Sequence, residues 1–201
     1  IDEKHKWSSW ANKEWRDKSD LVKFINNDLF PYLKDLNGTP EKNKIRDIFK
    51  DITNRIDSGG TILDAITILD KIDMDHIQDT HLLSSAYEEI IMESETQGDW
   101  SDQIYTPRPI VEFIVSRIKP KIGETIFDPF AGSCGFLIES YKYLINENKI
   151  GKKEWNTLQN NTFFGIEKKP VPYLLGTMNM ILHQILVPNL TRGNSLDKNV
   201  F

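Results

Sequence analysis

Apolar residues recur at helical spacing through most of the first ninety positions. Trp7, Trp10 and Trp15 lie among charged residues, which predicts an amphipathic helix over residues 4–18 whose tryptophan face docks on its own domain or on a partner. Four further stretches repeat apolar residues every three or four positions, namely 21–30, 41–57, 61–72 and 81–92. We therefore predict an all-helical bundle with short loops.

The ends of these predicted helices carry familiar start and stop signals. Ser19 or Asp20 is placed to cap the helix over residues 21–30, which we expect to end at Pro31. Thr61 and Asp64 resemble a capping pair for the helix that follows Gly60. These signals set the predicted boundaries within the bundle.

The pattern changes after residue 94. A polar stretch over residues 94–104 indicates a linker, and Thr106 is placed to cap a helix that runs to about Ile118. Two short apolar runs, 125–127 and 162–166, are typical of buried strands, and helical runs follow them at 137–145 and 170–186. Strands that alternate with helices predict a parallel sheet, so the fold class is α + α/β.

The charge is divided unevenly between the two halves of the chain. The 201 residues carry a net charge of −5, with 13 Lys and Arg against 21 Asp and Glu in residues 1–100 and 12 against 9 in residues 101–201. This shift favours a boundary between a helical domain over residues 1–98 and a second domain over residues 99–201. A net acidic bundle would meet DNA only through a local basic patch, for which the candidates are Lys42, Lys44, Arg46 and Lys50.

Cysteine and histidine usage narrows the possible chemistry. A single cysteine, Cys134, excludes an internal disulfide and a cysteine-rich zinc site and suits a reducing cytoplasm. His5, His76 and His81 have no partner at metal-ligand spacing, so we expect no metal site. Residues 170–191 lack charged side chains but include three prolines, which favours a buried helix over a membrane span.

The stretch Asp128-Pro-Phe-Ala-Gly-Ser-Cys-Gly-Phe136 lies between the first predicted strand and its helix. A glycine-bearing turn at this place lets a ligand approach the backbone and the unpaired N–H groups of the helix start. The Asp128 carboxylate suits an ammonium or a hydroxyl better than a phosphate. Glu167, at the end of the second strand, can accept hydrogen bonds from both hydroxyls of a ribose.

Asp-Pro-Phe-Ala-Gly-Ser-x-Gly-Phe-Leu resembles the S-adenosylmethionine (SAM) motif of amino-methylating DNA methyltransferases. With Tyr105-Thr106-Pro107-Arg108 before it and Gly165-Ile166-Glu167-Lys168 after it, nearly the whole chain resembles the modification (M) subunit of type I restriction-modification systems. The resemblance implies that the second domain is the first part of a Rossmann-like SAM-dependent methyltransferase domain in a prokaryotic cytoplasm.

The resemblance also implies roles for individual residues. The loop at Tyr105 would close over SAM, Thr106 would reach its methionine carboxylate, and Asn194 would replace the aspartate that reads the adenine edge. The expected cofactor-binding residues are Tyr105, Thr106, Asp128, Phe130, Gly132, Ser133, Gly135, Glu167 and Asn194.

Cys134 departs from the family pattern, in which glycine is more usual. We expect a negative φ at Cys134 and a turn carried by Gly132 and Gly135. The thiol is either a small packing residue or a reactive group that faces the pocket.

The catalytic tetrad of the family, Asn/Asp/Ser-Pro-Pro-aromatic, is absent, because no two of the nine prolines are adjacent. The resemblance places it beyond Phe201, so we expect no catalytic residue here and no methyl transfer by this piece alone. The longer protein would methylate adenine N6 in DNA, with partners in the specificity (S) and restriction (R) subunits. The alternatives are a SAM-dependent methyltransferase of protein or RNA amines and a non-catalytic module that binds partner subunits.

Overall fold

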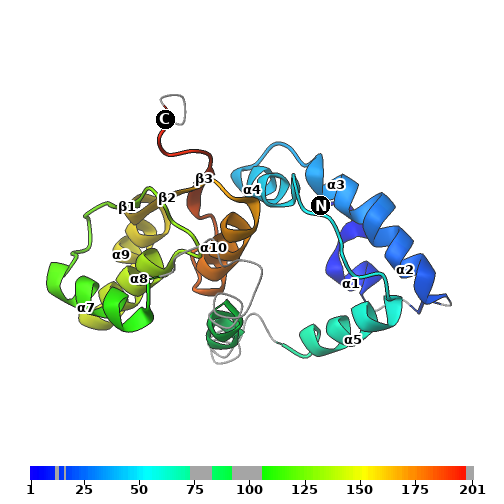
Figure 1. Cartoon of the computed structure of the whole chain (residues 1–201), viewed down its shortest axis with the longest axis horizontal. Coiled ribbons are helices and arrows are strands. Elements are labelled where there is room, and N and C mark those ends of the chain that lie inside the picture. The colour runs from blue at the N-terminus through cyan, green and yellow to red at the C-terminus, as the bar shows by residue number, and fades with distance from the viewer. Residues whose placement is uncertain (12–13, 16, 73–82, 92–105, 198–201) are drawn as a thin grey trace. The chain divides into compact units, whose positions relative to one another are not determined.

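The computed structural model describes residues 1–11, 14–15, 17–72, 83–91 and 106–197. The chain divides into two compact units, Ile1–Asp79 and Thr80–Phe201, and each is described by itself. The first unit is helical, and the second carries a small parallel sheet (Figure 1).

The helices of the first unit pack around one apolar cluster. They are η1 (Glu3–His5), α1 (Trp7–Trp10), α2 (Lys18–Phe24), the π-helical turn η2 (Ile25–Leu29), α3 (Phe30–Lys34), α4 (Pro40–Phe49) and α5 (Gly59–Leu69). Leu21, Ile25 and Ile66 are among the buried residues of the cluster, and Trp10 and Trp15 pack against it. Trp10 and Trp15 therefore dock on their own domain, as one of the two interpretations predicted, whereas Trp7 is 39% exposed.

The predicted helix over residues 4–18 is wrong, because residues 14 and 15 are not helical, and several helix ends also differ from the prediction. Only Trp7–Trp10 is α-helical within residues 4–11, and Asp17, rather than Ser19 or Asp20, caps α2 by accepting a hydrogen bond from the Ser19 N–H. The helix also continues past Pro31 to Lys34. The π-helical turn η2 ends two residues before this proline, in keeping with the missing N–H and the bulk of the ring.

The segment between α4 and α5 was predicted to be helical up to residue 57 but has no regular secondary structure beyond a turn after Phe49. α4 ends at Phe49, and the Asn54 side chain hydrogen-bonds both the N–H and the carbonyl of Ile56, at 2.9 and 3.0 Å. Such bonds compete with helical ones. Ser58 then caps α5 by accepting from the Thr61 N–H, so the predicted Thr61–Asp64 capping pair is wrong.

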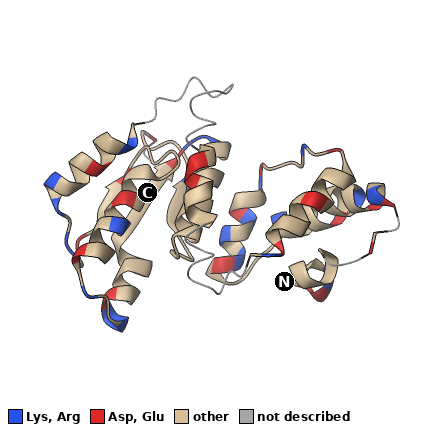
Figure 2. Cartoon of the chain, turned by 90° about the horizontal axis from the view of Figure 1, so that it is seen from below, with Lys and Arg blue, Asp and Glu red and all other residues tan. Residues whose placement is uncertain are grey.

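The predicted basic patch on α4 is interspersed with acidic and amide groups. Arg46 pairs with Asp47 at 3.1 Å and donates to Asn37 at 2.7 Å. Figure 2 shows Lys and Arg scattered among Asp, Glu and uncharged residues along the chain. The role of this patch in DNA binding stays a prediction.

The second unit is built on three parallel strands in the order β1-β2-β3: β1 (Ile126–Asp128), β2 (Phe163–Glu167) and β3 (Asn189–Arg192). In the register, Asp128 lies opposite Gly165 and Glu167 opposite Arg192. α7 (Arg108–Ile118) precedes β1, and α7 packs on α8 (Gly135–Glu147), which in turn contacts α10 (Pro170–Leu182). The predicted parallel sheet with helical connections is confirmed.

The connection between α8 and β2 contains a helix that the sequence pattern did not predict. α9 (Lys152–Thr157) and the π-helical turn η3 (Leu158–Thr162) fill it. α9 is polar apart from Trp155, so it lacks the apolar period by which the other helices were found.

Residues 83–91 form a helix that belongs to the second unit. The Tyr87 hydroxyl donates to the Leu175 carbonyl of α10 at 3.3 Å, and the Glu88 carboxylate pairs with Lys142 of α8 at 2.8 Å. The sequence pattern had assigned this helix to the N-terminal bundle. The predicted boundary at residues 98 and 99 lies outside the described residues.

Within the described ranges, every helix is too short or too polar to cross a membrane.

Candidate functional site

Two carboxylates lie at the carboxyl ends of neighbouring strands. Asp128 ends β1 and Glu167 ends β2, and the Asp128–Gly165 register places them at the same edge of the sheet. The loop over residues 129–134 leaves this edge and leads into α8. A parallel sheet offers its ligand crevice at this edge.

The Asp128 carboxylate is half-buried and accepts a hydrogen bond from the Phe130 N–H at 3.0 Å. Burial raises the pKa of the Asp128 carboxyl, the Phe130 N–H opposes this shift, and the negative charge of Glu167 adds to it. The charged form of Asp128 is therefore less favourable in this fold than in water, as expected where a cation is to be received.

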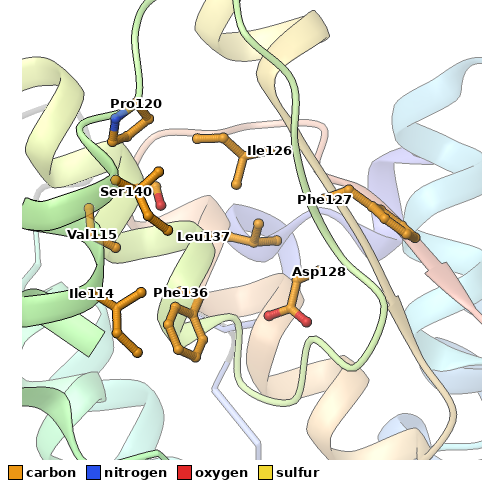
Figure 3. A pocket seen from close by; sticks show the side chains of 10 residues that line it. Ile114, Val115, Pro120, Ile126, Phe127, Asp128, Phe136, Leu137 and Ser140 are labelled. Atoms are coloured by element: carbon orange, nitrogen blue, oxygen red, sulfur yellow. The ribbon is translucent and has the colours of Figure 1, made fainter. Parts of the chain in front are cut away.

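An apolar cavity of about 300 Å³ adjoins Asp128 (Figure 3). α7, β1 and α8 line it, through Ile114, Val115, Ile118, Pro120, Ile126, Phe127, Asp128, Phe136, Leu137 and Ser140. In Figure 3, Phe127 points to the opposite side of β1 from Ile126 and Asp128. Among the described residues that line the cavity, Asp128 alone is charged, so the cavity suits a largely apolar group attached to a cation.

Glu167 joins the loops that follow all three strands. Its Oε2 accepts from the Gly132 N–H at 2.9 Å and its Oε1 from the Lys169 N–H at 2.7 Å. Its main-chain carbonyl accepts from the Gly193 N–H, which follows β3, at 3.0 Å. Each carboxylate oxygen keeps a further lone pair, so Glu167 can hold the loops and still accept from a ligand hydroxyl.

The turn after β1 uses two left-handed residues, and the predicted negative φ at Cys134 is wrong. Gly132 has φ +52° and Cys134 φ +65°, whereas Gly135 is not left-handed and begins α8. The cost of a side chain in this conformation is offset, because the Cys134 N–H donates to the Ala131 carbonyl at 2.7 Å and the thiol is fully buried. Of the two interpretations of the thiol, packing agrees with this burial.

The lack of a side chain at Gly135 leaves space for the Arg108 side chain and is not required by a left-handed backbone conformation. A Cβ built there would lie 3.1 Å from Nη1 of Arg108, which donates to the Gly135 carbonyl at 3.4 Å. Arg108 thus links the first turn of α7 to the first turn of α8. The sequence motif contained this arginine, but no role had been assigned to it.

The remaining predicted residues are spread around this edge. Phe130 is 67% exposed, while Ser133 is buried. Asn194 lies two residues beyond β3, and its side chain accepts from the Leu196 N–H at 3.3 Å. Thr106 is exposed and does not cap α7, whose N-cap is Pro107. Tyr105 lies outside the described residues.

The sequence prediction assigned no role to a group of polar residues that are buried or partly buried near α7, α8 and α10. Glu88 pairs with Arg108 at 3.3 Å and with Lys142 at 2.8 Å, and His183 lies 3.9 Å from the same carboxylate. Asn179, fully buried on α10, donates to the Ser133 carbonyl at 3.0 Å. The sequence signal that could have identified Asn179 is that it is the one amide side chain in the otherwise largely apolar helix α10. His183 Nδ1 lies 2.9 Å from the Asn179 carbonyl, as expected for a helix-end histidine with a partner.

The histidines of the N-terminal half offer no sign of a metal centre in what the structure describes. His5 is buried, stacks on Tyr32 at 3.7 Å and lies 3.2 Å from Asp28, while His76 and His81 fall outside the described residues. Across the described ranges, no group of three His, Cys, Asp or Glu side chains could hold a metal ion.

The chain is similar in sequence to a known protein family and to several known proteins. The sequence model of the N-6 DNA Methylase family matches residues 78–201. The chain is 36% identical over 204 residues to the type I restriction enzyme EcoEI methylase subunit of Escherichia coli, covering 98% of this chain and 41% of that protein. It is 26% identical to the StySJI methylase subunit of Salmonella typhimurium, with 93% of this chain and 36% of that protein covered.

Solved structures agree with the sequence relatives. A chain from a type I R-M system superposes with a TM-score of 0.89 at 38% identity and covers 99% of this chain and 41% of that one. A modification subunit from Vibrio vulnificus YJ016 gives a TM-score of 0.79 at 33% identity, with 98% and 44% covered. The 201 residues therefore span about two fifths of the length of the relatives that they match.

Proposed function

Because the chain belongs to the N-6 DNA methylase family, we propose that it is part of an M subunit of a type I restriction-modification system. The complete subunit transfers a methyl group from SAM to the N6 amine of adenine in DNA. A separate S subunit supplies sequence specificity, and an R subunit is a further partner. The relatives named as type I methylase subunits support this assignment, and the family match makes DNA a better substrate than protein or RNA amines.

One observation carries the proposal of a SAM site: the carboxylates of Asp128 and Glu167 end adjacent parallel strands on either side of a tight loop. SAM is a cation with an ammonium, a sulfonium and a ribose diol. These groups fit the half-buried Asp128 carboxylate, which adjoins an apolar cavity, and the Glu167 carboxylate. Glu167 lies two residues past Gly165, the residue opposite Asp128 in the sheet. The phosphates of a dinucleotide would be repelled by the same pair.

We assign the ligand groups to residues as follows. Asp128 receives the ammonium, and Glu167 receives the ribose hydroxyls. Asn194 reads the adenine edge, and Thr106 and Tyr105 contact the methionine carboxylate and close the pocket. The exposed ring of Phe130 and the backbone of Gly132, Ser133 and Gly135 shape the loop between the two carboxylates.

When bound, SAM supplies the electrophilic methyl group. The residues of this chain bind and orient it, so their effect on the reaction lies in positioning. The acceptors that hold the adenine amine belong to the Pro-Pro-aromatic tetrad, which this sequence lacks. The target base is extruded from the duplex to reach them.

The strand order supports a Rossmann-like domain. β3, β2 and β1 lie side by side and parallel, which is the order of one half of a doubly wound sheet, with its ligands at the carboxyl ends. We also propose that the methyltransferase domain begins near residue 80, where the second unit begins, so that it includes the helix over residues 83–91 and follows an N-terminal helical domain. We propose that the protein works in the prokaryotic cytoplasm.

Replacing Asp128 by alanine or asparagine is expected to weaken SAM binding by about 1–3 kcal/mol, because neither side chain carries the charge that pairs with the ammonium. Asparagine keeps an acceptor for the Phe130 N–H. Burial raises the pKa of Asp128, so wild-type affinity should fall with decreasing pH at a higher pH than for an ordinary carboxyl. The Asp128→Asn variant should lose this pH dependence.

Calorimetric titration with SAM between pH 5 and pH 8 measures these effects, with NAD as the control ligand. A buried charge is unfavourable in the ligand-free fold at neutral pH, so Asp128→Asn should not lower the melting temperature at pH 7. Equal SAM affinity of wild type and both variants, or tighter binding of NAD than of SAM, would contradict the proposed site.

The 201-residue chain alone is expected to transfer no methyl group to DNA, because the tetrad is absent from its sequence. Incubation of purified chain with tritiated SAM and unmethylated DNA should leave the DNA unlabelled, although the chain binds SAM. Label on adenine, in material free of host methylases, would show that the acceptor site lies within these residues.

A further inference from the structure

α10 lies in direct contact with the loop that follows β1. A Cβ built on Gly176 would lie 2.7 Å from the Gly132 carbonyl oxygen and 2.7 Å from Cys134 Sγ. No side chain can stand at that point, so the helix backbone meets the loop itself. Cys134, packed at this contact, is fully buried.

Asn179 lies about one helical turn beyond Gly176 and anchors the loop. Its Nδ2 donates to the Ser133 carbonyl at 3.0 Å, and the residue has no exposed surface. Ser133 is flanked by the two left-handed residues Gly132 and Cys134. The amide therefore holds the peptide at the centre of the turn, where a lost bond would leave a buried carbonyl without its donor.

The carbonyl oxygen of the Asn179 side chain indicates the role of this residue. Among the described residues, Asn179 Oδ1 has no hydrogen-bond partner although it is buried. A buried polar atom without a partner costs stability, and an apolar side chain of this size would avoid that cost. Packing alone does not account for an asparagine here, whereas donation to the Ser133 carbonyl does.

We propose that Asn179 is a positioning residue of the cofactor site: by holding the Ser133 carbonyl it keeps the loop over residues 131–135 in the conformation that receives SAM. Asn179 does not touch the ligand and acts through the loop. The inference rests on the proposed function, since it requires that the loop binds SAM.

Asn179→Asp is the most informative test, because its donor can be switched by pH. The ionised aspartate cannot donate to the Ser133 carbonyl, whereas the protonated form carries an O–H and matches the amide in shape. Burial will raise the pKa of an aspartate at this position. His183 Nδ1 lies 2.9 Å from the Asn179 carbonyl, and His183 in turn lies near Glu88, which pairs with Arg108 and Lys142. Their titration, and that of Asp128, is taken into account by measuring wild type at every pH.

SAM affinity of Asn179→Asp should be about tenfold below wild type at pH 8, and this ratio should shrink to about threefold or less at pH 5.5. Asn179→Leu, which has no donor at any pH, should keep a constant ratio to wild type. Melting temperatures recorded in parallel separate affinity from stability. Equal SAM affinities of wild type and Asn179→Leu across this pH range would overturn the inference, because leucine cannot donate to the Ser133 carbonyl at any pH.

Should Asn179→Asp fail to fold at pH 8, Asn179→Thr and Asn179→Val replace it, since they differ only by a hydroxyl donor. The threonine variant should bind SAM several-fold more tightly than the valine variant, and equal affinities would again overturn the inference. Failure of wild type to bind SAM would refute the proposed function instead, so the two failures are distinguishable.

Discussion

Glu167→Ala should weaken SAM binding by about 3 kcal/mol, or roughly a hundredfold, at pH 7.5. The substitution removes the acceptor proposed for the ribose hydroxyls. It also releases the N–H groups of Gly132 and Lys169, which the carboxylate holds at 2.9 and 2.7 Å. Loss of a ligand contact and loss of loop order combine, so we expect a larger effect than at Asp128. Calorimetric titration with SAM measures it.

Glu167→Gln separates the two contributions. The glutamine oxygen can accept from only one of the two N–H groups, and its NH₂ group faces the other, so an intermediate affinity is expected. Glu147, exposed at the end of α8, provides a matched Glu→Ala control that should leave binding unchanged. An unaltered SAM titration for Glu167→Ala would remove Glu167 from the site.

Gly59→Ala should destabilise the first unit by about 3 kcal/mol. Gly59 is buried at the start of α5, and a Cβ there would overlap the main-chain carbonyl oxygen of Lys18 and lie 2.7 Å from its carbonyl carbon. Lys18 begins α2, so this carbonyl cannot move without disturbing the helix. Urea unfolding followed by tryptophan fluorescence measures the change, because Trp10 and Trp15 pack against this core.

The adjacent glycine is the control. A Cβ on Gly60 would find its nearest neighbour, Ser58 Oγ, at 3.5 Å, which is an ordinary contact. Alanine there should raise stability by about 0.5–1 kcal/mol, since glycine is a poor helix residue. A Trp155→Phe background removes the described tryptophan of the second unit from the signal. Equal midpoints for Gly59→Ala and Gly60→Ala would contradict the contact with Lys18.

Helices were predictable wherever packing imposes an apolar period, and their ends were not. Asp17 and Ser19 both satisfy the rules for a cap, and only the path of the chain decides between them. After α4 ends at Phe49, the Asn54 side chain bonds to the backbone of Ile56, a local contact that periodicity does not register. α9 has few apolar residues, so no pattern announced it.

The site was predictable where a residue's role follows from its place on a strand. Asp128 and Glu167 end strands that the apolar runs identify, and neighbouring parallel strands bring their ends to one edge. Arg108 and Asn179 act on carbonyls 27 and 46 residues away in the sequence, so only the folded chain shows them. The φ of Cys134 was mispredicted because a buried contact and a hydrogen bond outweigh the local preference.

The open side of β1 has a consequence for how the molecule behaves at high concentration. Within the described residues β1 pairs with β2 alone, and Phe127 on it is 48% exposed. A bare strand edge with an aromatic side chain is a template for intermolecular pairing. A polypeptide that covers this strand would therefore also protect the protein from aggregation. Light scattering of the uncovered chain should rise steeply with protein concentration.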